Sequence, residues 1–172
     1  MKCTATNKAF RRQRRHDEGM KTAIRKCSLY LDCVMSDKMR WGKERINQIH
    51  STFNRIAEQV QTGELTTEQM MKTLKEEHGA NVIFRTGGRI RPRELYSDYI
   101  NGVHDTSDKI SVILLYLFIH IYGMGEAKTN SLMAGINETA RSVNLGYVTE
   151  KELERCLAEE EGVEVRRLKD VG

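Results

Sequence analysis

Residues 110–122 read Ile-Ser-Val-Ile-Leu-Leu-Tyr-Leu-Phe-Ile-His-Ile-Tyr, and they are the only stretch of the chain that is apolar on every face of a helix. A helix needs about 20 apolar residues to cross a bilayer, so this stretch is too short to span a membrane. A helix that is hydrophobic all round belongs inside a protein core. We therefore expect residues 110–122 to form a buried central helix against which amphipathic helices pack.

The composition is that of a globular protein. The chain has 172 residues, a length that suits one domain or two small ones. Of these residues, 39% are hydrophobic and 30% are charged. No apolar run follows the basic N-terminus, so we expect no signal peptide and a location in the cytoplasm, where the four cysteines would be reduced thiols. The single proline, Pro92, leaves the rest of the chain free to form long helices.

The chain aligns with itself, without a gap, when residue 42 is placed on residue 125, and we call this offset the repeat spacing. Residues 42–82 and 125–165 then share 12 identities over 41 positions, among them the threonines Thr66 and Thr149. The 83-residue unit is longer than the repeats of about 20–50 residues that build solenoids. Two copies predict a tandem duplication, a pseudo-symmetric pair like a homodimer fused into one chain.

Each unit is expected to contain three helices. The first covers residues 17–38 in one unit and the apolar stretch 110–122 in the other. The second has apolar residues every three or four positions and ends at Gly63 or Gly146, where a left-handed residue stops a helix. The third opens with a capping box at Thr66 in the first unit and at Thr149 in the second.

The segment between the units breaks this helical pattern. Two β-branched runs within residues 82–91 flank Thr-Gly-Gly and predict a small hairpin, which a short helix at 93–100 would follow. The predicted fold is therefore mainly α, with two tandem three-helix units. Its parts are a basic flexible tail (1–16), unit 1 (17–82), a linker with the hairpin and short helix (83–105), unit 2 (106–166) and a tail (167–172).

Positive charge is concentrated in residues 1–26 and 85–93. Basic segments of this density predict a phosphate or an acidic protein surface as partner. Alternating arginines on a two-stranded ribbon share one face, and a ribbon can enter a groove of nucleic acid. The same charges can instead protect an exposed strand edge, and the N-terminal run can be a solvated tail. The candidate binding residues are Arg11, Arg12, Arg14, Arg15, Arg85, Arg89, Arg91 and Arg93.

Residues 121–132, Ile-Tyr-Gly-Met-Gly-Glu-Ala-Lys-Thr-Asn-Ser-Leu, resemble the hairpin of helix-hairpin-helix DNA-binding proteins. In that motif a Gly-hydrophobic-Gly turn joins two helices, and backbone N–H groups of the second helix hold a phosphate. The resemblance implies phosphate contacts at Gly123, Gly125 and Lys128. The first unit lacks the first of these glycines and has Arg40 in its place, so an ordinary tight turn is the alternative.

The repeated pattern also resembles small helical proteins encoded by phages and mobile elements of Gram-positive bacteria. The resemblance lies in Tyr-Gly-Met-Gly at 122–125 and Asn-Leu-Gly-Tyr-Val-Thr at 144–149, and it continues through residues 153–163. The first unit departs from it, with Glu64 where Tyr147 stands. Because those relatives carry no assigned chemistry, the resemblance implies a setting more than an activity.

The sequence contains no Walker loop, nucleophile elbow or His-Glu-x-x-His motif, so we expect a protein that is not an enzyme and holds no cofactor. The five histidines lie in different segments, and we expect His120 to be a hydrogen-bonded core residue rather than a ligand or base. Cys27 and Cys33 do not share a helical face, which argues against a zinc site there.

The leading hypothesis is a non-enzymatic phage or mobile-element protein that binds nucleic acid or a host ribonucleoprotein, such as an effector nuclease complex. One form of this hypothesis is a counter-defence inhibitor of the anti-CRISPR kind. Another is a DNA-binding accessory factor in phage replication or recombination. A purely structural helical interaction protein is the alternative from a different class. We expect no membrane partner, and the sequence leaves homo-oligomerisation open.

Overall fold

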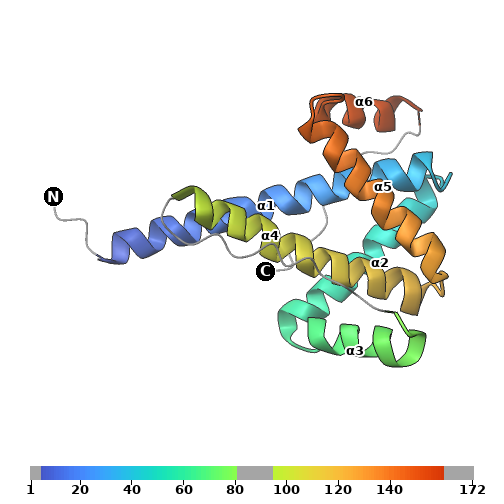
Figure 1. Cartoon of the computed structure of the whole chain (residues 1–172), viewed down its shortest axis with the longest axis horizontal. Coiled ribbons are helices and arrows are strands. Elements are labelled where there is room, and N and C mark those ends of the chain that lie inside the picture. Colours follow the sequence, from blue (N-terminus) through green and yellow to red (C-terminus); the bar gives the residue numbers. More distant parts are fainter. Residues whose placement is uncertain (1–4, 81–94, 161–172) are drawn as a thin grey trace.

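The computed structural model describes residues 5–80 and 95–160, and the prediction of a mainly α protein is confirmed there (Figure 1). Within these residues there is no strand, and the predicted hairpin at 82–91 and the tail at 167–172 lie outside them. The elements are α1 (Ala5–Asp37), α2 (Lys43–Thr62), α3 (Thr67–His78), α4 (Leu95–Leu115), the π-helix η1 (Tyr116–Ile121), α5 (Glu126–Asn144) and α6 (Glu150–Glu160).

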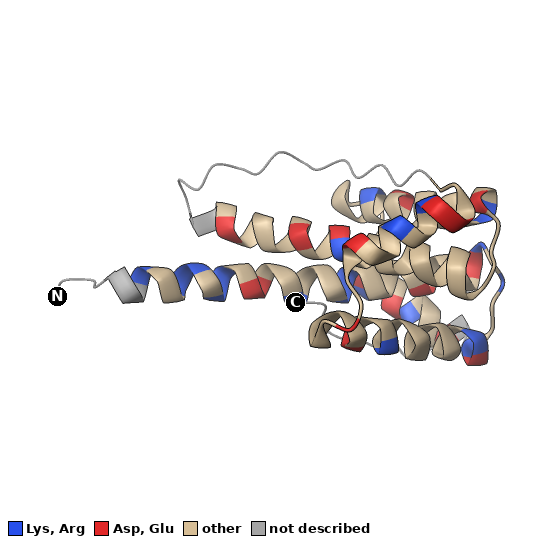
Figure 2. Cartoon of the chain, turned by 90° about the horizontal axis from the view of Figure 1, so that it is seen from below, with Lys and Arg blue, Asp and Glu red and all other residues tan. Residues whose placement is uncertain are grey.

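Helices α1 and α4 run side by side in the same direction through the molecule (Figures 1 and 2). Their backbones touch at Gly19 and Gly102. A Cβ atom on Gly19 would lie 2.1 Å from the carbonyl oxygen of Tyr99, and one on Gly102 would lie 2.2 Å from that of His16. Only glycine permits so close an approach. The two contacts are reciprocal, because the repeat spacing brings His16 onto Tyr99 and Gly19 onto Gly102.

The remaining helices pack around this pair. Helices α5 and α6 pack on α1, α3 packs on α4 and η1, and α2 contacts both central helices. Their apolar stripes meet in one principal core, to which α2 contributes Phe53, α3 contributes Met70 and α5 contributes Leu132. Helices α5 and α6, which follow α4 in the chain, therefore cover α1. Helix α3, which follows α1 and α2, covers α4.

The apolar stretch at 110–122 is buried as predicted over most of its length. Ile113, Leu117 and Phe118 are fully buried, whereas Ile121 and Tyr122 at its end are 42% and 37% exposed. The stretch is not a separate helix, because it continues α4 and passes into η1. The boundary between linker and unit 2 that we predicted at residue 105 consequently falls inside α4.

The first helix is longer than the sequence pattern predicted. We expected it to begin at Asp17 after a tail at 1–16, and it begins at Ala5. Residues 5–16 contain neither glycine nor proline, and arginine and alanine are good helix formers. Contacts one turn apart add to this, with Gln13 donating to Asp17 at 2.8 Å and Arg14 lying 3.3 Å from Glu18.

The helix ends follow the local signals in the sequence. Thr66 accepts from the backbone N–H of Gln69, whose side chain accepts from the N–H of Thr66, so the predicted capping box is present. The predicted stops are also present, since Gly63 and Gly146 have φ angles of 76° and 75°.

Backbone geometry also recurs at the repeat spacing before α2 and α5, where Arg40 and Gly123 have φ angles of 55° and 59°. Superposition of the two units stays a prediction.

We predict that replacing Gly19 or Gly102 with alanine destabilises the protein. Alanine favours an isolated helix, but here its methyl group would meet a carbonyl oxygen, and overpacking of this kind costs about 1–3 kcal/mol. Gly42→Ala is the control without a clash, because nothing lies within 4 Å of its added Cβ, and its loss reports only the weaker N-cap that alanine gives α2. Urea denaturation of the three variants measures the effect, and equal midpoints would contradict the close contact between α1 and α4.

Candidate functional site

The N-terminal half of α1 carries the densest positive charge in the described structure. Figure 2 shows it extending from the bundle, with Lys and Arg positions in blue along its ribbon. We call residues 8–15 the basic arm; its cationic members are Lys8, Arg11, Arg12, Arg14 and Arg15, and all are exposed. No acidic residue occurs in α1 before Asp17.

Helical periodicity gathers most of these charges on one side. Lys8, Arg11, Arg12 and Arg15 are spaced by three or four residues, which places them on a single stripe, with Arg14 beside it. The stripe spans about 10 Å along the axis, from the helical rise of about 1.5 Å per residue. A run of closely spaced phosphates can contact several of these side chains at once.

The ion pairs that the basic arm makes are loose. Arg15 lies 3.5 Å from Glu18, a carboxylate that Arg14 shares, and Arg12 lies 3.9 Å from Asp98 of α4. Exposed pairs of this kind contribute about 0–1 kcal/mol. In the described part of the chain, Lys8 and Arg11 form no ion pair. These cations are therefore available to an external anion at little cost.

The turn that resembles a helix-hairpin-helix motif lies between η1 and α5. Gly123 is left-handed, Gly125 is the N-cap of α5 without a side-chain cap bond, and Lys128 is exposed. Glu126 places a carboxylate in the first turn, where it competes with any anion for the helix N-terminus. Figure 1 shows this turn at the end of the molecule away from the basic arm, so the two candidate sites are not brought together.

The predicted hairpin site lies outside the described residues, and this applies to each of its four arginines, Arg85, Arg89, Arg91 and Arg93.

An ionisable pair that the sequence did not predict is buried between α1 and α2. His50 Nε2 lies 2.5 Å from Asp32 Oδ1, and the two side chains are 4% and 1% exposed. Burial raises the pKa of Asp32, and the hydrogen bond with His50 opposes this rise. The repeat spacing brings these residues onto Leu115 and Met133, so the second unit carries an apolar pair at the same two positions.

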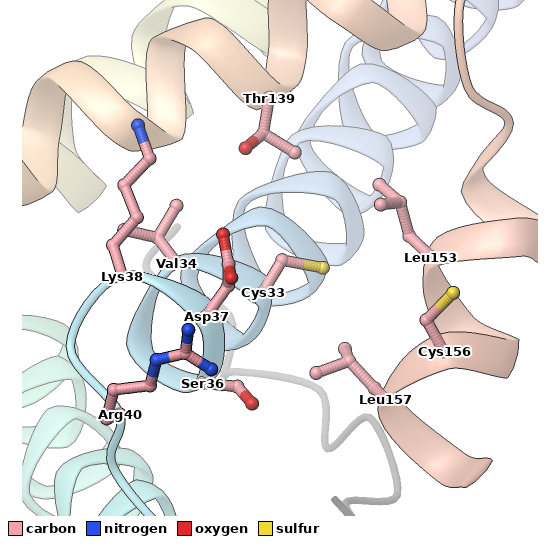
Figure 3. Close-up of a pocket in the computed structure, with 10 residues that line it drawn as sticks. All are labelled: Cys33, Val34, Ser36, Asp37, Lys38, Arg40, Thr139, Leu153, Cys156 and Leu157. Carbon is pink, nitrogen blue, oxygen red and sulfur yellow. The ribbon is translucent and has the colours of Figure 1, made fainter. Parts of the chain in front are cut away.

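The cysteines of α1 are not activated nucleophiles. Burial raises the pKa of the Cys27 thiol to about 11 and that of Cys33 to about 12. Cys33 lines a pocket between α1, α5 and α6 together with Asp37, Arg40 and Cys156 (Figure 3). Because a thiolate is the reactive form, the raised pKa lowers the nucleophilicity of Cys33 at neutral pH.

A cluster of one carboxylate and two imidazoles joins residues far apart in the sequence. Glu77 and His78 at the end of α3 meet His120 of η1, and their nearest ligand atoms all lie within 4.8 Å of one another. His120 is hydrogen-bonded, as predicted, but its side chain is 29% exposed and its partner is His78. Neither motif spacing nor periodicity could reveal this cluster, because a tertiary contact between α3 and η1 creates it.

The chain has no significant match among protein-family models, curated proteins or solved structures. None of the described helices is long and apolar enough to cross a membrane.

We predict that the buried pair can be exchanged only as a pair. Asp32→Leu leaves the His50 imidazole buried without its partner, and removing one member of such a pair costs about 3–5 kcal/mol. Adding His50→Met should restore most of that loss, since both positions become apolar as they are at 115 and 133. Urea denaturation of the wild type, both single variants and the double variant measures the coupling; purely additive losses would contradict the prediction.

Proposed function

We propose that this chain is a non-enzymatic nucleic-acid-binding protein and that the basic arm contacts the phosphate backbone. The observation that carries the proposal is the set of five exposed cations within eight residues of one helix, two of them without an ion-pair partner in the described structure. Arginine suits this role because its planar guanidinium group donates two parallel hydrogen bonds to a phosphate.

The structure of the arm favours nucleic acid over an acidic protein surface. A lone α-helix has the dimensions that the major groove of DNA admits, and the arm extends from the bundle (Figure 2). Phe10, also on this helix, is 69% exposed and offers an aromatic face on which an unpaired base can stack. The helix is continuous with the core, so little conformational entropy is lost when its charges bind.

The proposed setting is a phage or mobile element, and it rests on the resemblance at residues 122–125 and 144–149. Within that setting the proposal has two forms. In one, the chain binds free DNA as an accessory factor in replication or recombination. In the other, the arginines engage nucleic acid that a host effector already holds, and the chain acts as a counter-defence inhibitor.

We further propose that the chain arose by tandem duplication of an 83-residue unit. The 12 identities between 42–82 and 125–165 support this origin. So do the reciprocal backbone contacts at Gly19 and Gly102 and the left-handed residues at both ends of the second helices. The basic arm has no counterpart in the second unit, because Ser97 and Asp98 stand where Arg14 and Arg15 stand in the first.

The test replaces Arg11, Arg12, Arg14 and Arg15 with alanine and measures binding to a labelled DNA duplex by fluorescence anisotropy. Affinity should fall for every sequence tested, because phosphate contacts carry no sequence information. The slope of log affinity against log salt should shrink by about 0.9 for each duplex phosphate that is no longer neutralised. Alanine is a strong helix former, so α1 should remain helical, which circular dichroism verifies.

A charge-matched variant separates the arm from the net charge. Four exposed cations lie elsewhere on α2, α3 and α6, namely Lys43, Arg55, Lys72 and Lys151. Their replacement by alanine removes four positive charges, as many as the arm variant loses. This control should bind almost as tightly as the wild type. Binding to a host ribonucleoprotein alone would favour the inhibitor form. Equal behaviour of all three proteins towards duplex, single strand and ribonucleoprotein would overturn the proposed function.

A further inference from the structure

We propose that Glu77, His78 and His120 form a binding site for one divalent transition-metal ion, with Zn²⁺ as the best-matched ion. The three groups come from two elements, since α3 ends with Glu77 and His78 and η1 supplies His120. This inference is independent of the nucleic-acid function, because the cluster shares no residue with the basic arm.

The distances between the ligand atoms suit a tetrahedral ion. His78 Nε2 lies 3.2 Å from His120 Nδ1, and His120 Nδ1 lies 3.4 Å from Glu77 Oε2. Two atoms bonded to a tetrahedral Zn²⁺ ion at about 2.0–2.1 Å lie about 3.3 Å apart. Both separations therefore match the spacing of two ligand atoms on a shared ion. The Glu77 oxygen is the third ligand atom, and all three ligand atoms lie within 4.8 Å of one another.

The local fold holds the two imidazoles in place. His120 stacks on the ring of Tyr116, with 4.7 Å between ring centroids, and meets His78 edge-on at 5.4 Å. Beside the cluster, Leu74, Ala80 and Ile119 form a small apolar core of their own. His120 also belongs to a π-helix, a distortion that is rare in proteins and is frequent at functional sites. Two of the three ligands are thus oriented before an ion binds.

The donor set selects the class of ion. Two imidazole nitrogens and one carboxylate oxygen suit Zn²⁺, Cu²⁺ or Ni²⁺, whereas Mg²⁺ and Ca²⁺ prefer oxygen ligands alone. The carboxylate offsets one of the two charges of the ion. The Glu77 side chain is 59% exposed, so an ion can enter from solvent and keep water at a fourth position. An ion held here would tie the end of α3 to η1, the continuation of α4.

The repeat predicts one such site in each chain. At the repeat spacing, Asp37 takes the place of His120, and Glu160 and Glu161 take the places of Glu77 and His78. The imidazole pair is therefore absent from the second set of positions. Carboxylates alone are the ligands of harder ions, so Zn²⁺ should bind the first set in preference.

Isothermal titration of the untagged full-length protein with Zn²⁺ tests the proposal. We expect saturable binding of one ion per chain. Glu77→Gln and His78→Asn should each weaken it about tenfold or more, the loss that disturbed metal coordination produces. Both residues are exposed, so these variants should fold normally. His104→Asn, which changes an exposed histidine on α4, is the matched control and should bind like the wild type.

A second measurement identifies the ligand atoms and needs no variant. Long-range ¹H–¹⁵N spectra of the imidazoles should show Zn²⁺ shifting Nε2 of His78 and Nδ1 of His120, with the other three histidines unchanged. The proposal is overturned if no saturable binding occurs, if His78→Asn binds as tightly as the wild type, or if the shifts fall on other histidines.

Discussion

The fold depends on the backbone contact between α1 and α4. The carbonyl oxygen of Tyr99 occupies the space that a side chain at Gly19 would need, and Gly102 stands in the same relation to His16. This contact holds the central helices as one element, on which the apolar stripes of the other helices converge in a principal core. Because α5 and α6 cover α1 while α3 covers α4, each half of the chain completes the packing of the other. The two halves should therefore unfold together.

The same contact positions the basic arm. Gly19 anchors α1 to α4, and the helix continues from there towards its N-terminus, where Arg12 and Asp98 make a loose pair at 3.9 Å. The charges are thus carried by a helix continuous with the core. A flexible tail with the same arginines would lose more conformational entropy on binding, so a helical arm would bind the proposed nucleic-acid partner more tightly without any added contact. Its salt dependence would still report the number of phosphates neutralised.

What the sequence predicted well is local. The caps at Thr66 and Thr149 and the stops at Gly63 and Gly146 depend on hydrogen bonds within a few residues, and the burial of 110–122 follows from its apolarity. The helical N-terminal half of α1 was not predicted, because a run of arginines has the composition of a solvated tail and no apolar period. Tertiary contacts were equally invisible: Asp32 with His50, and His120 with the end of α3, meet only after the helices pack.

The repeat spacing shows how the two proposed halves differ chemically. A buried charge left without its partner is costly, so a pair such as Asp32 and His50 must be exchanged as a unit. The other half has Leu115 and Met133 at these two positions, and there both polar groups are replaced together. On the surface the constraint is weaker, and Asp37 stands where the other half has His120. An imidazole and a carboxylate are both hydrophilic, yet the imidazole suits zinc and copper whereas the carboxylate suits harder ions. Under the proposed duplication, burial would preserve matched partners in the core, whereas a more exposed position would be free to change its ligand chemistry independently of its neighbours.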